Sequence, residues 1–177
     1  MARVFFALWP PTEVAWQLSA VADSFAAQAG GKATRRETIH LTLAFIGDVP
    51  VERLPDLECA ARNVHAEAFD LTLDQFGLWH HNRIFWAGCS VVPLALVELA
   101  SALGAALQAT GFDVADAHRN FTPHVTLARK VKALGAPLPP GQRLPWRCKK
   151  FVLVRSQLSA SGAFYQTLAE FSLSGRR

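Results

Sequence analysis

The chain has 177 residues, of which 51% are hydrophobic and 18% are charged. These values are typical of one globular domain with a substantial core, and they exclude an intrinsically disordered chain. The longest apolar stretch, residues 91–107, is interrupted by proline, glutamate, serine and glycine, and it is shorter than the ~20 residues that a membrane-spanning helix requires. We therefore predict a single domain over residues 1–177 that does not bind to membranes.

The net charge of +4 and the isoelectric point near 9.3 favour an anionic partner, although a basic soluble protein without such a partner would have the same values. The basic residues gather in the segments 32–36, 129–132, 143–150 and 176–177. Three widely spaced cysteines, Cys59, Cys89 and Cys148, argue against a disulfide framework and for a reducing compartment. The apolar run after Met1 ends at Pro10, too early for a signal peptide, so we expect a cytoplasmic protein.

Hydrophobic periodicity and turn residues divide the chain into alternating strands and helices. In the first half we expect a strand at residues 3–9, a helix at 12–29, a strand at 39–45, a turn at 47–50 and a helix at 51–68. In the second half we expect a strand at 69–78, a hairpin connection at 80–83, a strand at 84–90 and a helix from 93 to about 110. A strand at 122–130 and a loop at 133–145 follow. The chain ends in a hairpin of strands at 151–159 and 164–173 that turns at 160–162.

The order strand, helix, strand occurs twice in this prediction, once before residue 46 and once between residues 84 and 130. It is a weak internal repeat, and two such units facing each other would form a two-lobed α+β domain. We predict a pseudo-twofold duplication of βαβ-type units, with antiparallel sheets lining a central cleft and the helices outside.

The strongest signal in the sequence is a short motif at the same place in both units. His40-Leu41-Thr42-Leu43 recurs 84 residues later as His124-Val125-Thr126-Leu127. A shuffled chain of this composition would contain about 0.04 copies of His-x-Thr-Leu, so two copies are a strong signal. On a strand, each histidine shares a face with the threonine two residues later. An amphipathic strand without a function explains one copy well, but it explains two copies poorly.

Two imidazoles suit acid–base chemistry at phosphorus, because an ordinary pKa of ~6.5 allows one ring to be neutral while the other is protonated. The entering and leaving oxygens of an in-line displacement lie on opposite sides of the phosphorus, so the two histidines would approach from opposite flanks. Thr42 and Thr126 would donate hydrogen bonds to the non-bridging oxygens, and Arg129 could add a charge-assisted contact. These residues alone leave open which of His40 and His124 is the acid.

The remaining histidines and the cysteines give weaker signals. His80 and His81 are expected in a solvated turn, and His65 and His118 are isolated. The cysteines lack Cys-x-x-Cys spacing and the histidines lack a zinc-binding pattern, so we expect no metal and no other cofactor.

Neither a serine nucleophile nor an aromatic base-binding site stands out clearly. No Gly-x-Ser-x-Gly elbow surrounds the serines at 156, 159 and 161, which we expect to belong to a hairpin. Trp9, Phe121 and Trp146 could stack on a base, but core packing is the more common role of such side chains.

Longer stretches around the motifs carry a family resemblance. They are Phe5-Phe6-Ala7-Leu8 ahead of Pro10-Pro11, residues 40–47 (HLTLAFIG), residues 121–130 (FTPHVTLARK), and residues 154–158 (VRSQL) with Gly162 and Tyr165 after them. The chain resembles the two-histidine phosphoesterase superfamily and, within it, the RNA 2′,3′-cyclic phosphodiesterases, also called 2′-5′ RNA ligases. The resemblance spans nearly the whole chain. It departs at Phe171-Ser172-Leu173, where relatives often have Phe-Pro-Leu, and this departure affects no site residue.

The resemblance implies a metal-independent hydrolase that opens a terminal 2′,3′-cyclic phosphate on RNA and leaves a 2′-phosphate. His40 matches the histidine that donates a proton to the departing 3′-oxygen, and His124 matches the one that accepts a proton from the attacking water. The reverse reaction, with an RNA 5′-hydroxyl in place of water, would form a 2′,5′ bond. We expect RNA ending in a 2′,3′-cyclic phosphate as the partner, and a monomer. Two alternatives stay open: a non-catalytic RNA-binding module, and a phosphodiesterase for a small cyclic-phosphate metabolite.

Overall fold

The structure is a computed structural model that describes residues 1–114, 121–159 and 162–174. Its elements are β1 (Ala2–Leu8), α1 (Thr12–Ala29), β2 (Lys32–Ala33), the 3-10 helix η1 (Arg36–Thr38), β3 (Leu41–Val49), the 3-10 helix η2 (Val51–Arg53), α2 (Leu54–Arg62), β4 (Phe69–Leu73), β5 (Gln75–Trp79), β6 (Ile84–Gly88), α3 (Leu94–Ala109), β7 (Val125–Arg129), β8 (Leu144–Cys148), β9 (Lys150–Ser159) and β10 (Gly162–Ser172).

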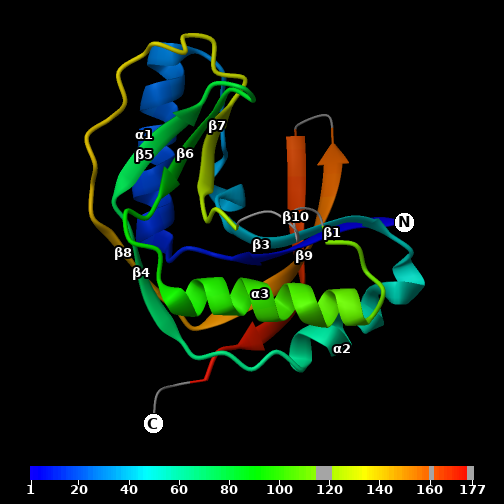
Figure 1. The fold of residues 1–177 in the computed structure, drawn as a ribbon. Helices are drawn as coiled ribbons and strands as arrows, with labels where there is room; N and C mark the ends of the chain where they lie inside the picture. The colour runs from blue at the N-terminus through cyan, green and yellow to red at the C-terminus, as the bar shows by residue number, and fades with distance from the viewer. Residues whose placement is uncertain (115–120, 160–161, 175–177) are drawn as a thin grey trace.

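The described strands form one large antiparallel sheet and one short pair. The large sheet has the order β10-β9-β1-β3-β7-β6-β5, with β2 added beside β7, and the short pair joins β4 to β8. At the centre of the large sheet, β3 meets β7 through the single residue pair Leu41 and Val125. Figure 1 shows β5, β6 and β7 at a steep angle to β1 and β3. The sheets of the two predicted lobes are thus joined edge to edge at this narrow contact.

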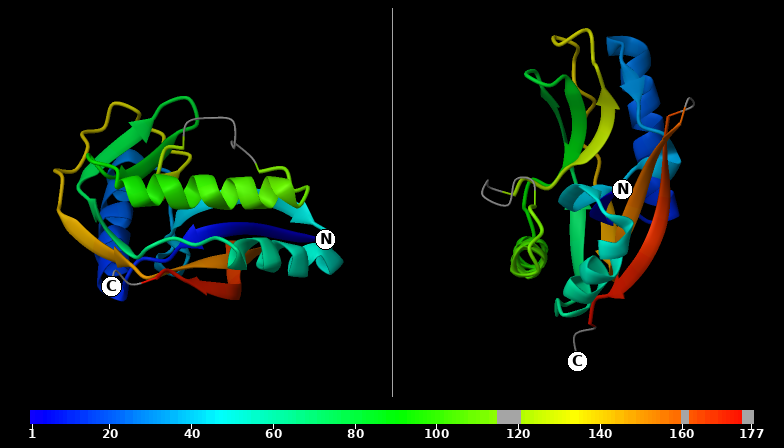
Figure 2. Two further views of the ribbon diagram at one scale, coloured as in Figure 1. Left: turned by 60° about the horizontal axis from the view of Figure 1, so that its bottom comes forward. Right: turned by 90° about the vertical axis from the view of Figure 1, so that its right-hand side faces the viewer.

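The two repeated units are present, and the predicted two-lobed α+β fold is confirmed. β1 pairs with β3 and β6 pairs with β7, both antiparallel. Each helix nevertheless packs on a strand of the other unit, because α1 lies against β7 and α3 lies against β3 (Figures 1 and 2). Phe25 of α1, for example, stacks on Phe85 with ring centroids 3.8 Å apart. This exchange makes the two units share one buried core.

Two elements of the first half differ from the prediction in their ends. β3 continues to Val49 through the expected turn, because Gly47 adopts a φ of +87° and the strand has a bulge opposite β1 at this point. The helix expected over residues 51–68 ends at Arg62. Residues 66–68 instead form backbone hydrogen bonds with Ser174, which hold this segment in an extended conformation.

The second half contains two further differences. The strand expected over residues 69–78 is divided into β4 and β5, which belong to different sheets. Asp74 lies at the corner, where its carboxylate accepts hydrogen bonds from the backbone and the hydroxyl of Ser90. β8 begins in the last two residues of the expected loop and continues to Cys148, where no element was expected. Its strand character is clear from the alternate burial of Leu144, Trp146 and Cys148. The expected turn at 160–161, His118 and the basic pair at 176–177 lie outside the described residues.

Candidate active site

The pairing of β3 with β7 brings the two His-x-Thr motifs together. Leu41 and Val125 are partners across the strands, and both are fully buried on the core face. In an antiparallel pair the flanking residues oppose each other, which sets His40 opposite Thr126 and Thr42 opposite His124. These four side chains share the face away from the core, on strands about 5 Å apart. The structure therefore gathers the predicted histidines and threonines on one surface, related by an approximate twofold axis.

The two histidines also repeat each other in their hydrogen bonds. Nδ1 of His40 lies 2.7 Å from the carbonyl oxygen of Thr38, and Nδ1 of His124 lies 2.8 Å from that of Thr122. A carbonyl oxygen only accepts hydrogen bonds, so each Nδ1 carries a proton and donates it. Nε2 of each neutral ring then carries a lone pair and can exchange a proton with a substrate. Nε2 of His40 is also 3.1 Å from the hydroxyl oxygen of Thr42.

Aromatic rings surround His40. Its imidazole centroid is 4.8 Å from the ring of Phe5, 5.6 Å from that of Trp9 and 5.5 Å from that of Tyr165. Phe5 comes from β1 and Tyr165 from β10, which the sheet order places on the same side of β3. These rings hold the imidazole in a fixed orientation and shield it from water.

His124 has a more open setting with one principal aromatic neighbour. The ring of Trp79, at the end of β5, meets the imidazole edge-on with centroids 4.5 Å apart. Trp79 in turn contacts Trp86 at 5.4 Å. The approximate symmetry of the motifs therefore does not extend to their surroundings, and the two histidines have different environments.

Burial and nearby charge lower the pKa of both histidines. Burial is the larger cause and brings the pKa of His40 to about 4, against the raising effect of its hydrogen bond to Thr38. The charges of Arg129 and His124 lower the pKa of His40 further. Burial and then Arg129 also lower the pKa of His124, against its hydrogen bond to Thr122. Both rings are consequently neutral at neutral pH in the free protein.

Arg129 supplies positive charge at the end of β7. It is exposed, it lies beside Lys32 of β2 in the strand register, and it forms no ion pair within the described part of the chain. The positive charge of Arg129 lowers the pKa of both histidines. Burial raises the pKa of Tyr165, whereas the charges of Arg129, Arg3 and Arg35 lower it. An anion bound beside the histidines would therefore lie in a positive potential.

Of the residues that the structure describes, three histidines outside the motifs are exposed, and one of them, His81, has its ring centroid 6.4 Å from that of Trp79. His80 and His81 are exposed in the turn between β5 and β6, and His65 is exposed after α2, as expected. Across the described ranges, no group of three or more histidine, cysteine, aspartate or glutamate side chains is arranged to hold a metal ion. Within the same residues, no helix is long and apolar enough to span a membrane.

The three aromatic candidates have different positions. Trp146 is 2% exposed in the core and Phe121 packs against the core, as the common role of such residues predicts. Trp9 instead contacts His40. Sequence reasoning did not identify Phe5, Tyr165 or Trp79 as neighbours of the histidines, because their proximity depends on the order of strands in the sheet. Phe5 and Tyr165 lie in stretches that carry the family resemblance, but no signal in the sequence indicates Trp79.

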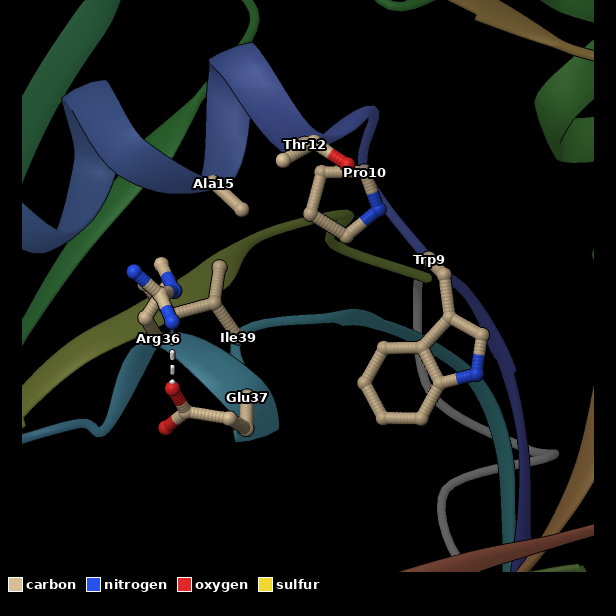
Figure 3. Close-up of a pocket in the computed structure, with 7 residues that line it drawn as sticks. All are labelled: Trp9, Pro10, Thr12, Ala15, Arg36, Glu37 and Ile39. Carbon is tan, nitrogen blue, oxygen red and sulfur yellow. Dashed lines mark hydrogen bonds and ion pairs between the residues drawn. The ribbon is translucent and has the colours of Figure 1, made fainter.

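A pocket of about 230 Å³, drawn in Figure 3, has no histidine in its lining. It is lined by Trp9, Pro10, Thr12, Ala15, Arg36, Glu37 and Ile39. Trp9 is therefore shared by this pocket and the surroundings of His40.

Comparison with known proteins identifies the family. The RNA 2′,3′-cyclic phosphodiesterase of Escherichia coli (strain K12) is 30% identical over 171 residues, which cover 97% of this chain and 96% of that protein. This chain belongs to the RNA 2′,3′-cyclic phosphodiesterase family. The phosphodiesterase of Thermus thermophilus is 33% identical over 98% of this chain and 91% of that protein. The family model "LigT like Phosphoesterase" matches residues 8–86, which include the first motif.

Solved structures agree with this phosphodiesterase family assignment. E. coli LigT complexed with 3′-AMP superimposes with a TM-score of 0.88 at 30% identity, covering 97% of this chain and 98% of that one. A Thermus thermophilus protein, TT0787, has a TM-score of 0.86 at 29% identity, covering 99% of this chain and 100% of that one. The MHV ns2 PDE domain, at 14% identity and a TM-score of 0.60, shares the fold alone. The two bacterial structures match over both halves of the chain, so both His-x-Thr motifs fall within the shared fold.

Proposed function

We propose that this member of the phosphodiesterase family hydrolyses the terminal 2′,3′-cyclic phosphate of RNA to a 2′-phosphate, with His40 and His124 as acid and base. The observation that carries the proposal is the pairing of Leu41 with Val125, which opposes the two motifs on one face of the sheet. The substrate class comes from the names of the relatives in E. coli and T. thermophilus. The order of acid and base comes from the family resemblance.

His124 is the base in this proposal. Its Nδ1 proton is held by the carbonyl of Thr122, so the lone pair on Nε2 is available in the neutral ring. Because burial and Arg129 lower its pKa, the ring is neutral before substrate binds. Nε2 removes a proton from water as the water oxygen forms a bond to phosphorus.

His40 is the acid and donates a proton from Nε2 to the departing 3′-oxygen as the bond between phosphorus and this oxygen breaks. The pKa of about 4 means that the free protein holds little of this proton at neutral pH. A bound phosphate anion opposes the effect of burial, because a negative charge in contact with the ring stabilises the imidazolium. We therefore propose that His40 takes up its proton as the cyclic phosphate binds.

Thr42, Thr126 and Arg129 hold the phosphate. The two hydroxyl groups lie on the same face as the histidines and would donate hydrogen bonds to the non-bridging oxygens. The Arg129 guanidinium would add a charge-assisted hydrogen bond, which is about twice as strong as a neutral one. With Arg129 beside the bound anion, the growing negative charge on these oxygens is stabilised in the transition state.

The proposal extends to the partner, the assembly and the compartment. The substrate is an RNA or oligonucleotide that ends in a 2′,3′-cyclic phosphate, the chain acts as a single monomeric domain over residues 1–177, and no metal takes part. The three thiols at positions 59, 89 and 148 are free, which fits a cytoplasmic location. With an RNA 5′-hydroxyl in place of water, the same groups would form a 2′,5′ bond in reverse.

Product analysis tests the reaction. An oligoribonucleotide ending in a 2′,3′-cyclic phosphate is incubated with the protein in EDTA, and the product is followed by phosphorus NMR. We expect a single 2′-phosphate product. A 3′-phosphate product would reverse the assignment of the leaving oxygen, and binding of the oligonucleotide without turnover would favour a non-catalytic RNA-binding module. Turnover of a small cyclic-phosphate metabolite but not of the oligonucleotide would favour the other alternative.

A further inference from the structure

The pocket beside the histidines lies where the start of α1 meets η1. Ile39, which forms part of its wall, directly precedes His40 in the chain and is 1% exposed. Neither His40 nor His124 lines the pocket. Its position next to the candidate active site, combined with its concave shape, makes it a place where another part of the substrate can bind.

Trp9 separates the pocket from His40. One side of the indole meets the imidazole at a centroid distance of 5.6 Å, with the two rings at 75°. Figure 3 shows the six-membered ring of Trp9 pointing into the pocket, with its nitrogen on the far side. A ligand in the pocket would therefore contact the Trp9 ring, and the indole would separate it from the His40 imidazole.

Arg36 forms the opposite wall and is held in place. Its guanidinium lies 3.7 Å from the centroid of the Trp16 ring and donates a hydrogen bond of 2.9 Å to Oε1 of Glu37. The Arg36 side chain is 33% exposed, so further N–H groups remain open to a ligand. The pocket thus combines an aromatic ring with an oriented cation. This combination binds bases of single-stranded nucleic acids with little dependence on sequence.

We propose that this pocket binds the nucleobase of the nucleotide on the 5′ side of the terminal one. The terminal nucleoside carries the reacting phosphorus, so its ribose must lie against His40. The pocket begins only beyond Trp9 and excludes His40, which fits the next nucleoside along the RNA. This inference rests on the proposed hydrolysis of RNA cyclic phosphates. Through this pocket, Trp9 and Arg36 would make the protein prefer substrates of two or more nucleotides over a single nucleotide.

The test compares a nucleoside 2′,3′-cyclic phosphate, which is too short to reach the pocket, with a dinucleotide that ends in the same cyclic nucleotide. For the unmodified protein we expect the dinucleotide to have a kcat/KM about tenfold or more above that of the mononucleotide. Arg36→Ala should lower the kcat/KM of the dinucleotide about tenfold, mainly through KM, and leave the mononucleotide unchanged.

Two further variants keep the test independent of folding effects. Thr12→Trp adds a bulky group at the exposed rim of the pocket, and it should also remove the dinucleotide advantage. Arg53→Ala is the matched control, because Arg53 similarly stacks on an aromatic ring, that of Phe112, and does not line the pocket. It should leave both substrates unchanged.

The possible outcomes separate this inference from the proposed function. Equal losses on both substrates in Arg36→Ala, or no loss in either pocket variant, would overturn the pocket assignment while leaving hydrolysis intact. Absence of turnover for both substrates in the unmodified protein would overturn the proposed function itself.

Discussion

Replacing His40 should make the stability of the protein less sensitive to acid. The folded protein keeps His40 neutral down to a pKa of about 4, whereas the ordinary pKa of histidine is 6.5. Between these two pH values the unfolded chain binds a proton that the folded chain does not, so the free energy of unfolding falls as the pH decreases. The stability that the neutral ring contributes is fully present above pH 6.5 and is lost as the pH falls to about 4.

The size of the effect follows from the pKa difference. At 1.36 kcal/mol for each pKa unit, the difference corresponds to roughly 3 kcal/mol. Because the His40 side chain keeps some contact with solvent, we expect about 2–3 kcal/mol. The assay is urea unfolding of the parent protein and of His40→Gln at pH 7 and pH 4. The free energy of unfolding should fall more steeply in the parent, by about this amount.

His80→Gln is the matched control, since His80 is exposed in the turn between β5 and β6. It should have the same pH dependence as the parent. If His40→Gln also loses stability between pH 7 and pH 4 as steeply as the parent, then the burial of a neutral imidazole at this position is refuted.

Three further predictions concern the site and its support. The pH profile of kcat/KM should be bell-shaped with its maximum below about pH 6.5, because the reaction needs a neutral His124 and a proton that His40 takes up as the substrate binds. A maximum above about pH 7.5 would contradict the pKa of His40. Arg129→Gln should lower kcat/KM about 10–100-fold and raise the pKa of both histidines in NMR titrations, and unchanged pKa values would show that the guanidinium is remote. Gly77→Ala should destabilise the protein by about 1–3 kcal/mol in urea unfolding, because the added Cβ would overlap the Trp86 indole. Gly104→Ala in α3 meets no neighbour and should stabilise the protein by up to ~1 kcal/mol. Equal effects of the two substitutions would contradict this prediction.

The sequence predicts the local elements well where periodicity is strong. The strands that carry the two motifs and the helices at α1 and α3 come from apolar spacing together with glycine and proline signals. Prediction fails where contacts between distant parts of the chain determine the local conformation. Residues 66–68 were expected to end a helix, but they are extended because Ser174 pairs with their backbone. Pro145 is typical of a loop, yet β8 tolerates it because, among the described strands, β8 pairs with β4 alone and its other edge needs no backbone donor.

The candidate site is predicted in part for the same reason. The alternation of side chains on a strand indicates that His40 and Thr42 share a face, and the repeat suggests that His124 and Thr126 approach them. The pairing of Leu41 with Val125 cannot be predicted from local sequence patterns, because the two residues are 84 positions apart in the chain. It also does not indicate that Tyr165 would reach His40, since this contact depends on β9 and β1 lying between β10 and β3.

Turnover of an oligoribonucleotide 2′,3′-cyclic phosphate by single histidine variants tests the central claim most directly. The assay compares the parent with His40→Ala and His124→Ala in EDTA, with His65→Ala as a control at an exposed position after α2. We expect loss of at least two orders of magnitude in kcat for each motif variant, as for the removal of a general acid or base, and parent activity for the control. Near-full activity in either motif variant would contradict the two-histidine mechanism.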